Sequence, residues 1–235
     1  MSRIFLVVPV GLAALALVVT AAWAGERRAP AAADLGIAIA PAAQSQPTAE
    51  PAPADAGAAP RPDPDWVSTV AARTGVTERA LTAYAAASLR VEQEQPGCRL
   101  GWTTLAGIGQ IETGHGQGGL DAEGKSDGAI QGPALDGTEG NAAITEDGAP
   151  DRARGPMQFI ASTWRAWAAD ADGDGEADVD DVDDATLAAA RYLCASGADL
   201  TTPAGWTQAV HSYNHSDEYV RAVLGAANTY AARSR

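Results

Sequence analysis

The sequence predicts an all-α fold with short irregular connections between the helices. Apolar residues recur at helical spacing along most of the chain after Asp63. No segment alternates apolar and polar residues as a half-buried strand would. Residues that typically begin and end helices, such as Thr77 and Gly114, stand at the borders of the periodic segments. The length of 235 residues fits one folded domain preceded by an N-terminal extension.

The N-terminal extension is typical of an exported protein. After Arg3, residues 4–24 carry no charge, and Ala22-Trp23-Ala24 has the small-x-small form of a signal-peptidase site. The uncharged run is also long enough to span a bilayer if it is not cleaved. Residues 1–24 are therefore predicted to be a signal peptide or a membrane anchor. Either one places the rest of the chain outside the cytoplasm, secreted or held on the outer face of the cytoplasmic membrane.

Composition divides the remainder into two parts. Residues 25–62 are dominated by alanine and proline, have little to bury and are predicted to form a disordered linker. Residues 63–235 are predicted to form the folded domain. The formal net charge is −14, which argues against a nucleic-acid partner because phosphate binding needs clustered cations.

Within the folded domain, helices are predicted between Gly, Pro and capping residues. The segment 114–154 is rich in glycine and has no sustained period, so it is expected to be a long irregular loop. Loops of this length in a compact domain are usually functional. The predicted helices, in chain order, are 66–73, 78–94, 102–113, one that begins near 162 and carries Trp164 and Trp167, 185–195, 207–212 and 217–232.

Glu112 is the most informative residue of the predicted helix 102–113. Leu105, Ile108 and Glu112 share one face of that helix, which is otherwise apolar. A carboxylate on a core-facing stripe loses its water, and this favours the protonated form. Such a group can act as a general acid near neutral pH. The alternative is a glutamate that turns to solvent at a frayed helix end.

The segment D-A-D-G-D-G-E-A-D-V-D-D, residues 170–181, predicts a calcium loop. It matches the EF-hand pattern at positions 1, 3 and 5, with Gly175 at the sharp turn. The last ligand is Asp181 at position 12, or Asp184 in a slightly longer loop. The alternative is an acidic, disordered connector. The other candidate ligands are Asp170, Asp172, Asp174 and the backbone carbonyl of Glu176.

Two further motifs could bind a sugar. The turn 155–159 interrupts the helical pattern and offers the Gln158 amide, which both donates and accepts hydrogen bonds. Tyr213 and Asn214, followed by Tyr219, place aromatic rings beside an amide. The alternatives are a packed turn and a helix cap at Asn214 or Ser216. The histidines do not have a recognised metal spacing and are predicted not to be ligands; they are His115, His211 and His215.

The chain has two cysteines, Cys98 and Cys194. An isolated pair in an exported protein predicts one disulfide. The alternative is two buried free thiols.

Taken together, five motifs resemble the lytic transglycosylases of the membrane-bound B type. These are bacterial cell-wall enzymes with a lysozyme-like fold. The resemblance covers about Trp102 to Tyr230. The motifs, in order, are I-E-T-G-H-G, G-P-M-Q-F-I-A-S-T-W, D-x-D-G-D-G, A-A-R-Y-L-C and Y-N-H-S-D-E-Y-V.

The resemblance implies a role for each candidate residue. Glu112 would be the sole catalytic acid and base of a catalytic domain at 63–235. The acidic loop would bind one structural Ca²⁺ with Asp184 as its last ligand, and Cys98 would pair with Cys194. The glycan groove would be lined by Met157, Gln158, Tyr192, Tyr213, Asn214 and Tyr219.

The implied reaction is cleavage of peptidoglycan at the β-1,4 bond between N-acetylmuramic acid and N-acetylglucosamine, with a 1,6-anhydromuramyl end as product. Two alternatives remain: a muramidase-type hydrolase on the same scaffold, and a non-catalytic peptidoglycan-binding module. A desolvated Glu112 favours an enzyme, because a binding module gains nothing from it.

Overall fold

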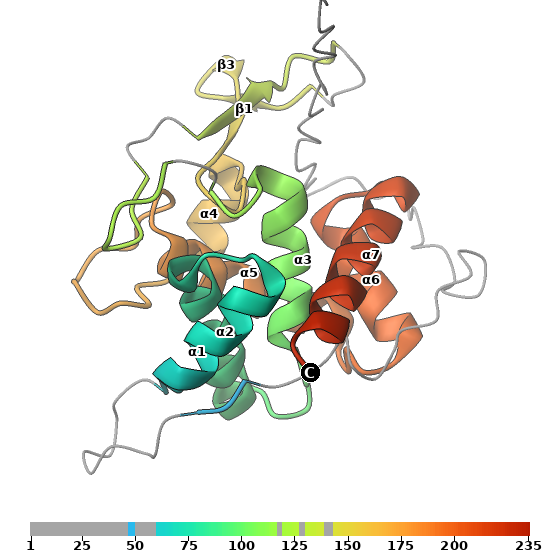
Figure 1. Cartoon of the computed structure of the whole chain (residues 1–235). Coiled ribbons are helices and arrows are strands. Elements are labelled where there is room, and N and C mark those ends of the chain that lie inside the picture. Colours follow the sequence, from blue (N-terminus) through green and yellow to red (C-terminus); the bar gives the residue numbers. More distant parts are fainter. Residues whose placement is uncertain (1–46, 50–59, 117–118, 127–129, 139–142) are drawn as a thin grey trace, which may run out of the picture.

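The computed structural model describes residues 47–49, 60–116, 119–126, 130–138 and 143–235. The described part is mostly helical, as predicted (Figure 1). Its helices are α1 (Pro64–Thr74), α2 (Glu78–Glu94), α3 (Trp102–Thr113), α4 (Ala161–Trp167), α5 (Val182–Gly197), α6 (Pro203–Tyr213) and α7 (Asp217–Arg233).

The predicted signal peptide or anchor, residues 1–24, lies outside the described residues, and so does most of the predicted linker 25–62. Among the helices that the structure describes, none combines the length and the apolar character needed to cross a membrane.

Local capping explains where the helices begin. Thr77 accepts a hydrogen bond from the Ala80 N–H and starts α2 at the predicted residue. Ser216, not Asn214, caps α7 by accepting from the Tyr219 N–H. Thus α6 ends and α7 begins on either side of a short break, as the sequence indicated.

Two helices are longer than predicted because their caps lie further upstream. Asp181 accepts hydrogen bonds from the N–H groups of Asp183 and Asp184, so α5 starts before Ala185. Thr202 caps α6 just before Pro203, a residue well suited to the first turn of a helix.

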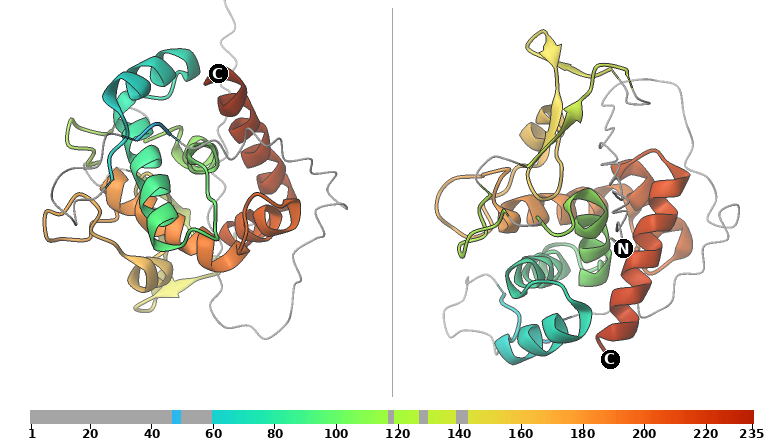
Figure 2. Two further views of the ribbon diagram at one scale, coloured as in Figure 1. Left: turned by 90° about the horizontal axis from the view of Figure 1, so that it is seen from below. Right: turned by 45° about the horizontal axis from the view of Figure 1, so that its top comes forward.

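Helix α3 lies in the middle of the helical body, with α2 and α7 on either side (Figures 1 and 2). Two glycines allow the close approach. A Cβ at Gly107 would be 2.9 Å from the Val223 carbonyl oxygen of α7, and one at Gly109 would overlap the Tyr84 hydroxyl of α2. Most residues of α3 are buried, so this helix forms the centre of the core.

The expectation of no strands in segment 114–154 is wrong. β1 (Gln131–Ala134) pairs antiparallel with β4 (Arg152–Arg154), and β2 (Thr145–Glu146) pairs with β3 (Ala149–Pro150). Both sheets lie at one end of the helical body (Figure 1). The strands are too short to show alternation in the sequence. The β2–β3 turn is Asp147-Gly148, both at positive φ, and this dipeptide is a hairpin signal that the periodicity argument overlooked.

Cys98 and Cys194 form a disulfide, as predicted. It joins the segment that precedes α3 to α5, across 96 residues of sequence. A bridge that closes so long a loop restricts the unfolded chain and stabilises the fold by about 3–5 kcal/mol.

We therefore expect the Cys98→Ser/Cys194→Ser double variant to lose about 3–5 kcal/mol of unfolding free energy, measured by urea denaturation. Wild-type protein kept under reducing conditions should shift its midpoint by a similar amount. Equal midpoints for the oxidised wild type and the double variant would show that the bridge does not stabilise the fold.

Candidate active site

Glu112 lies in the last turn of α3 with its side chain enclosed by the protein. Only 5% of the residue is exposed. Its Oε1 accepts a hydrogen bond of 2.6 Å from the Tyr219 hydroxyl of α7. Its Oε2 is buried and has no hydrogen-bond partner among the described residues. The alternative of a frayed, solvated helix end is therefore wrong, because Gly114 ends α3 cleanly in the left-handed conformation.

Burial raises the pKa of Glu112 to about 8, because the surrounding protein disfavours the charged carboxylate. The Tyr219 hydrogen bond acts in the opposite direction, since it stabilises the carboxylate, but its effect is smaller. The carboxyl is thus protonated at neutral pH and can donate a proton. Because the pKa lies close to neutrality, the same group can also take a proton back.

Replacing Tyr219 with phenylalanine should raise the pKa of Glu112 above about 8, because the variant loses the hydrogen bond that favours the carboxylate. NMR titration of the Glu112 side-chain carboxyl carbon measures this shift. Tyr192→Phe is the matched control, since the Tyr192 hydroxyl donates to the Ser212 carbonyl oxygen instead. A Glu112 pKa that falls, or stays the same, in Tyr219→Phe would contradict this account.

The turn 155–159 lies directly beside the end of α3. The Thr113 hydroxyl donates to the Pro156 carbonyl oxygen at 2.8 Å. Arg154 and Phe159 exchange two backbone hydrogen bonds of 2.9 Å, which close the turn. Within it, Gln158 has a φ of 52° and its side-chain amide donates to the Gly155 carbonyl oxygen. The turn is therefore held from α3 on one side and from β4 on the other.

Several of the predicted groove residues are connected to one another. The Tyr213 hydroxyl of α6 donates to the Met157 carbonyl oxygen at 2.9 Å. The ring of Tyr192 packs edge-on against that of Tyr213, with centroids 5.7 Å apart. Asn214 ends α6. All six predicted groove residues are buried, so their contact with a sugar remains a prediction; they are Met157, Gln158, Tyr192, Tyr213, Asn214 and Tyr219.

The acidic loop brings three of the predicted calcium ligands together. Carboxylate oxygens of Asp170, Asp172 and Asp184 lie within 4.8 Å of one another. Asp184 is buried at the start of α5 and accepts from the N–H groups of Ala171 (2.6 Å) and Asp178 (2.8 Å). Burial raises its pKa to about 6. A cluster of hard oxygen atoms with a buried acid at its base suits a divalent cation such as Ca²⁺.

The side chains of Asp174 and Asp181 are not part of this cluster. Asp174 forms an ion pair with Lys125 at 2.9 Å, and its Oδ1 accepts from the Glu176 N–H. Asp181 points at the N–H groups of its own helix as the cap of α5. Of the two alternatives for the last ligand, the geometry thus places Asp184 in the cluster.

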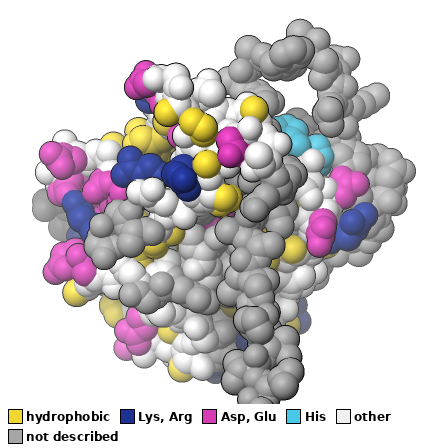
Figure 3. Space-filling model, turned by 90° about the horizontal axis from the view of Figure 1, so that it is seen from above, with side chains coloured by type: hydrophobic (Ala, Val, Ile, Leu, Met, Phe, Trp, Pro, Cys, Tyr) yellow, Lys and Arg dark blue, Asp and Glu magenta, His cyan; other side chains and the backbone are white. Residues whose placement is uncertain are grey.

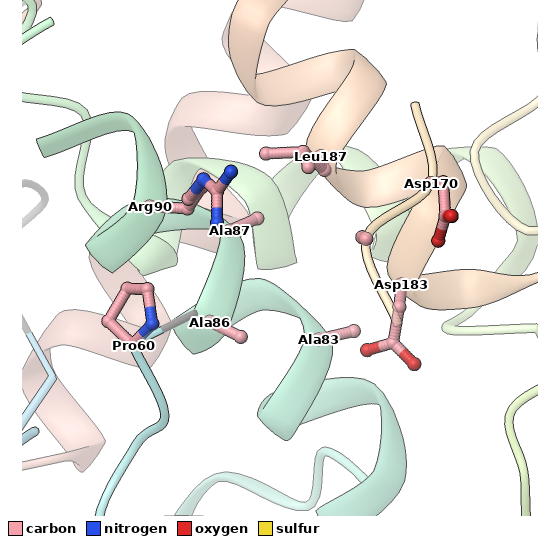
Figure 4. A pocket seen from close by; sticks show the side chains of 9 residues that line it. Pro60, Ala83, Ala86, Ala87, Arg90, Asp170, Asp183 and Leu187 are labelled. Carbon is pink, nitrogen blue, oxygen red and sulfur yellow. The ribbon is translucent and has the colours of Figure 1, made fainter. Parts of the chain in front are cut away.

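A small pocket lies beside the acidic loop rather than at Glu112 (Figure 4). Asp170 and Asp183 are at one end and Arg90 at the other, with Pro60 on the wall opposite α5. Alanine side chains of α2 and Leu187 of α5 form its apolar lining. Asp170 is the one predicted site residue among its lining residues.

The face that bears the small sheets carries a group of basic side chains beside apolar ones (Figure 3). Most acidic side chains visible in this view lie toward its edges, and histidine is visible at one side.

His115 is a residue whose surroundings the sequence did not reveal. It was predicted only not to be a metal ligand. Its side chain is buried between Tyr84 of α2 and Tyr230 of α7 and contacts both hydroxyls. The motif I-E-T-G-H-G placed it three residues after Glu112, but its partners are 31 and 115 residues away in the sequence.

Comparison with known proteins gives one family match. Residues 139–210 match the family model of the transglycosylase SLT domain. Two solved structures of the Escherichia coli lytic transglycosylase SLT35 are similar to the chain, each at 16% identity. The complex with calcium has a TM-score of 0.45 and the alignment covers 74% of this chain and 77% of that one. For the complex with bulgecin A the values are 0.44, 74% and 81%. The comparison with curated proteins gives no match. The family match includes the turn 155–159, the acidic loop and α5, and begins after Glu112.

Proposed function

We propose that this chain, an enzyme with a transglycosylase SLT domain, is a lytic transglycosylase that cleaves peptidoglycan strands with Glu112 as its single catalytic acid and base. The observation that carries the proposal is the buried, protonated carboxyl of Glu112. Burial and the Tyr219 hydroxyl account for its pKa, and no second carboxylate contributes to the shift. A mechanism that uses one carboxyl group in two roles fits this arrangement.

In the first step, the protonated Glu112 gives its proton to the glycosidic oxygen between N-acetylmuramic acid and N-acetylglucosamine. The bond from C1 of the muramyl sugar to that oxygen breaks, and the N-acetylglucosamine part leaves with the new hydroxyl. The N-acetyl carbonyl oxygen of the muramyl sugar stabilises the positive charge at C1, as in substrate-assisted glycosidases.

In the second step, the Glu112 carboxylate takes the proton of the 6-hydroxyl of the same muramyl sugar. The 6-oxygen attacks C1 and closes a 1,6-anhydro ring. Glu112 ends the cycle protonated, and no water is consumed. The short Tyr219 hydrogen bond stabilises the carboxylate between the two steps.

The reaction product tests this proposal. The exported protein is incubated with purified peptidoglycan, and the released muropeptides are measured by mass spectrometry beside a Glu112→Gln control. Products about 18 Da lighter than reducing muropeptides are expected, because the anhydro end lacks one water. Reducing ends would instead indicate a muramidase-type hydrolase, and no release by the wild type would favour a peptidoglycan-binding module.

For the acidic loop we propose one structural Ca²⁺, held by Asp170, Asp172 and Asp184, with the Asp174 side chain and the Glu176 carbonyl joining when the ion binds. The cluster of the first three carboxylates supports this proposal. The ion would neutralise part of the negative charge of the loop and would take no part in the chemistry. Asp174 would then exchange its Lys125 partner for the ion.

Calcium should raise the melting temperature of the wild type and should have little effect on Asp184→Asn, which removes one charge from the cluster. A ligand at 100 times its Kd stabilises the folded state by about 2.7 kcal/mol. Differential scanning fluorimetry with Ca²⁺ or EDTA measures the difference. Asp65→Asn, at an exposed position in α1, is the matched control and should respond like the wild type. An equal Ca²⁺ response of Asp184→Asn and the wild type would exclude the proposed site.

The proposed substrate also indicates where in the cell the protein acts. Peptidoglycan lies outside the cytoplasm, so a protein that cleaves it is exported. We infer that residues 1–24 serve this export, and that they are either cleaved or kept as an anchor on the outer face of the cytoplasmic membrane. The mass of the exported protein distinguishes the two: a chain that starts at Gly25 has been cleaved and secreted.

A further inference from the structure

A buried chain of hydrogen bonds crosses the core at the end of α3. The Tyr84 hydroxyl of α2 lies 3.0 Å from Nδ1 of His115. Nε2 of His115 lies 2.8 Å from the Tyr230 hydroxyl of α7. The Tyr230 hydroxyl in turn donates to Oε1 of Gln110 at 2.8 Å. The chain therefore links α2 and α7 through the segment that ends α3.

The direction of every hydrogen bond in this series follows from the last residue, Gln110. The Gln110 Oε1 can only accept a hydrogen bond, so the single O–H of Tyr230 must donate to it. The Tyr230 oxygen then accepts from Nε2 of His115, which fixes the proton on that nitrogen. Nδ1 is left as an acceptor for the Tyr84 hydroxyl. One neutral tautomer of His115 satisfies all three bonds.

His115 holds a backbone conformation that favours glycine. Its φ is 67°, and its N–H donates to the Gly109 carbonyl oxygen near the end of α3 at 2.9 Å. A residue with a side chain in this region costs about 1–2 kcal/mol. The contacts of the imidazole with Tyr84 and Tyr230 offset this cost and keep the last turn of α3 closed.

We propose that His115 is a positioning residue for Glu112, which it serves by fixing the last turn of α3 between α2 and α7. The inference rests on the proposed function. Glu112 precedes His115 by three residues, so any movement of that turn carries the carboxyl with it. Tyr219 to Glu112 and Thr113 to Pro156 hold side chains of the turn, and the Gly114 N–H closes its backbone onto the Gln110 carbonyl oxygen. His115 adds the side-chain link from this turn to both α2 and α7.

Burial keeps His115 neutral as this role requires. It lowers the pKa of the imidazole to about 4, so both nitrogens keep their roles at neutral pH. The groups facing the ring are the neutral phenols of Tyr84 and Tyr230, whose pKa values are raised by burial. Glu112 itself is faced by the phenols of Tyr213 and Tyr219, which are also neutral.

The test uses His115→Phe, which keeps an aromatic ring and removes both nitrogens. We expect kcat on peptidoglycan to fall about tenfold or more while KM changes little, because misplacement of a catalytic group lowers the rate of the chemical step. A looser turn also lets water reach Glu112, so its pKa falls and the alkaline limb of the pH profile moves to lower pH. A merely structural role would leave this profile unchanged below the melting temperature.

Milder variants keep the test valid if His115→Phe does not fold. Tyr84→Phe and Tyr230→Phe each remove one hydroxyl of the chain and should move the same pH limb by smaller amounts. His115→Asn should restore part of kcat, because asparagine tolerates positive φ and its amide can replace one ring nitrogen. Thr229→Ala is the control on α7, since its exposed hydroxyl bonds only within that helix.

The proposal is overturned if kcat and the pH profile stay those of the wild type in the folded variants, whatever happens to their melting temperature. NMR titration of Glu112 separates this outcome from failure of the proposed function. An inactive wild type whose Glu112 pKa still falls in Tyr84→Phe and Tyr230→Phe would contradict the assigned reaction and support the positioning role.

Discussion

Glu112→Gln should lower the turnover of peptidoglycan by about 10³-fold or more, because glutamine can neither give a proton to the glycosidic oxygen nor take one back. The side chains are nearly equal in shape, and Tyr219 can still donate to the remaining oxygen at the position of Oε1. The rate of muropeptide release at a fixed enzyme concentration measures the loss. Binding of the variant to insoluble peptidoglycan, measured by co-sedimentation, should be retained.

The same variant should differ from the wild type in its pH-dependent stability. The pKa of Glu112 rises from 4.5 to about 8 on folding, so between these values the folded state holds a proton that the unfolded state has lost. Its stabilising contribution is complete below about pH 4.5 and is lost as the pH rises through about 8. Glutamine does not ionise, so Glu112→Gln should lose less stability than the wild type over this range. Parallel stability curves from pH 5 to 9 would show that the carboxyl is not desolvated.

How much the sequence could predict depended on whether a signal was local. The start of α2 at Thr77 and the end of α3 at Gly114 come from capping residues that act within one turn, and both were predicted correctly. The burial of Glu112 followed from its place on the apolar face of α3. The small sheets were missed because two to four paired residues are too few to form a pattern.

Contacts between distant segments could not be predicted from one sequence. Nothing in the sequence pairs Tyr84 or Tyr230 with His115, because a tyrosine at a buried helical position fits the core equally well without a partner. For the same reason, the sequence left open whether Asp181 or Asp184 is the last ligand of the predicted calcium loop. Both residues stand at the end of the EF-hand-like segment in the sequence. In the structure they differ: Asp181 caps α5, whereas the Asp184 carboxylate lies near those of Asp170 and Asp172.

Gly155→Ala should be the most disruptive single change outside α3. Gly155 has a φ of 73°, and a Cβ there would overlap the Val179 carbonyl oxygen at the end of the acidic loop. The positive φ alone costs about 1–2 kcal/mol, and forcing two backbones apart adds about 1–3 kcal/mol. Because the contact is between two backbone segments, no side chain can move aside to relieve it. Thermal unfolding should show a correspondingly lower melting temperature.

The activity of Gly155→Ala should also fall, because the turn that moves carries Met157 and Gln158 and contacts α3 through Pro156. Gly148→Ala is the matched control. Its φ of 82° imposes the same backbone strain, but a Cβ there meets nothing within 4 Å. If both variants lose equal stability and neither loses activity, the close approach at Gly155 has no role at the site. A loss of stability and activity confined to Gly155→Ala would show that the acidic loop supports the turn beside Glu112. An ion bound in the acidic loop, residues 170–184, would then affect catalysis only through this packing.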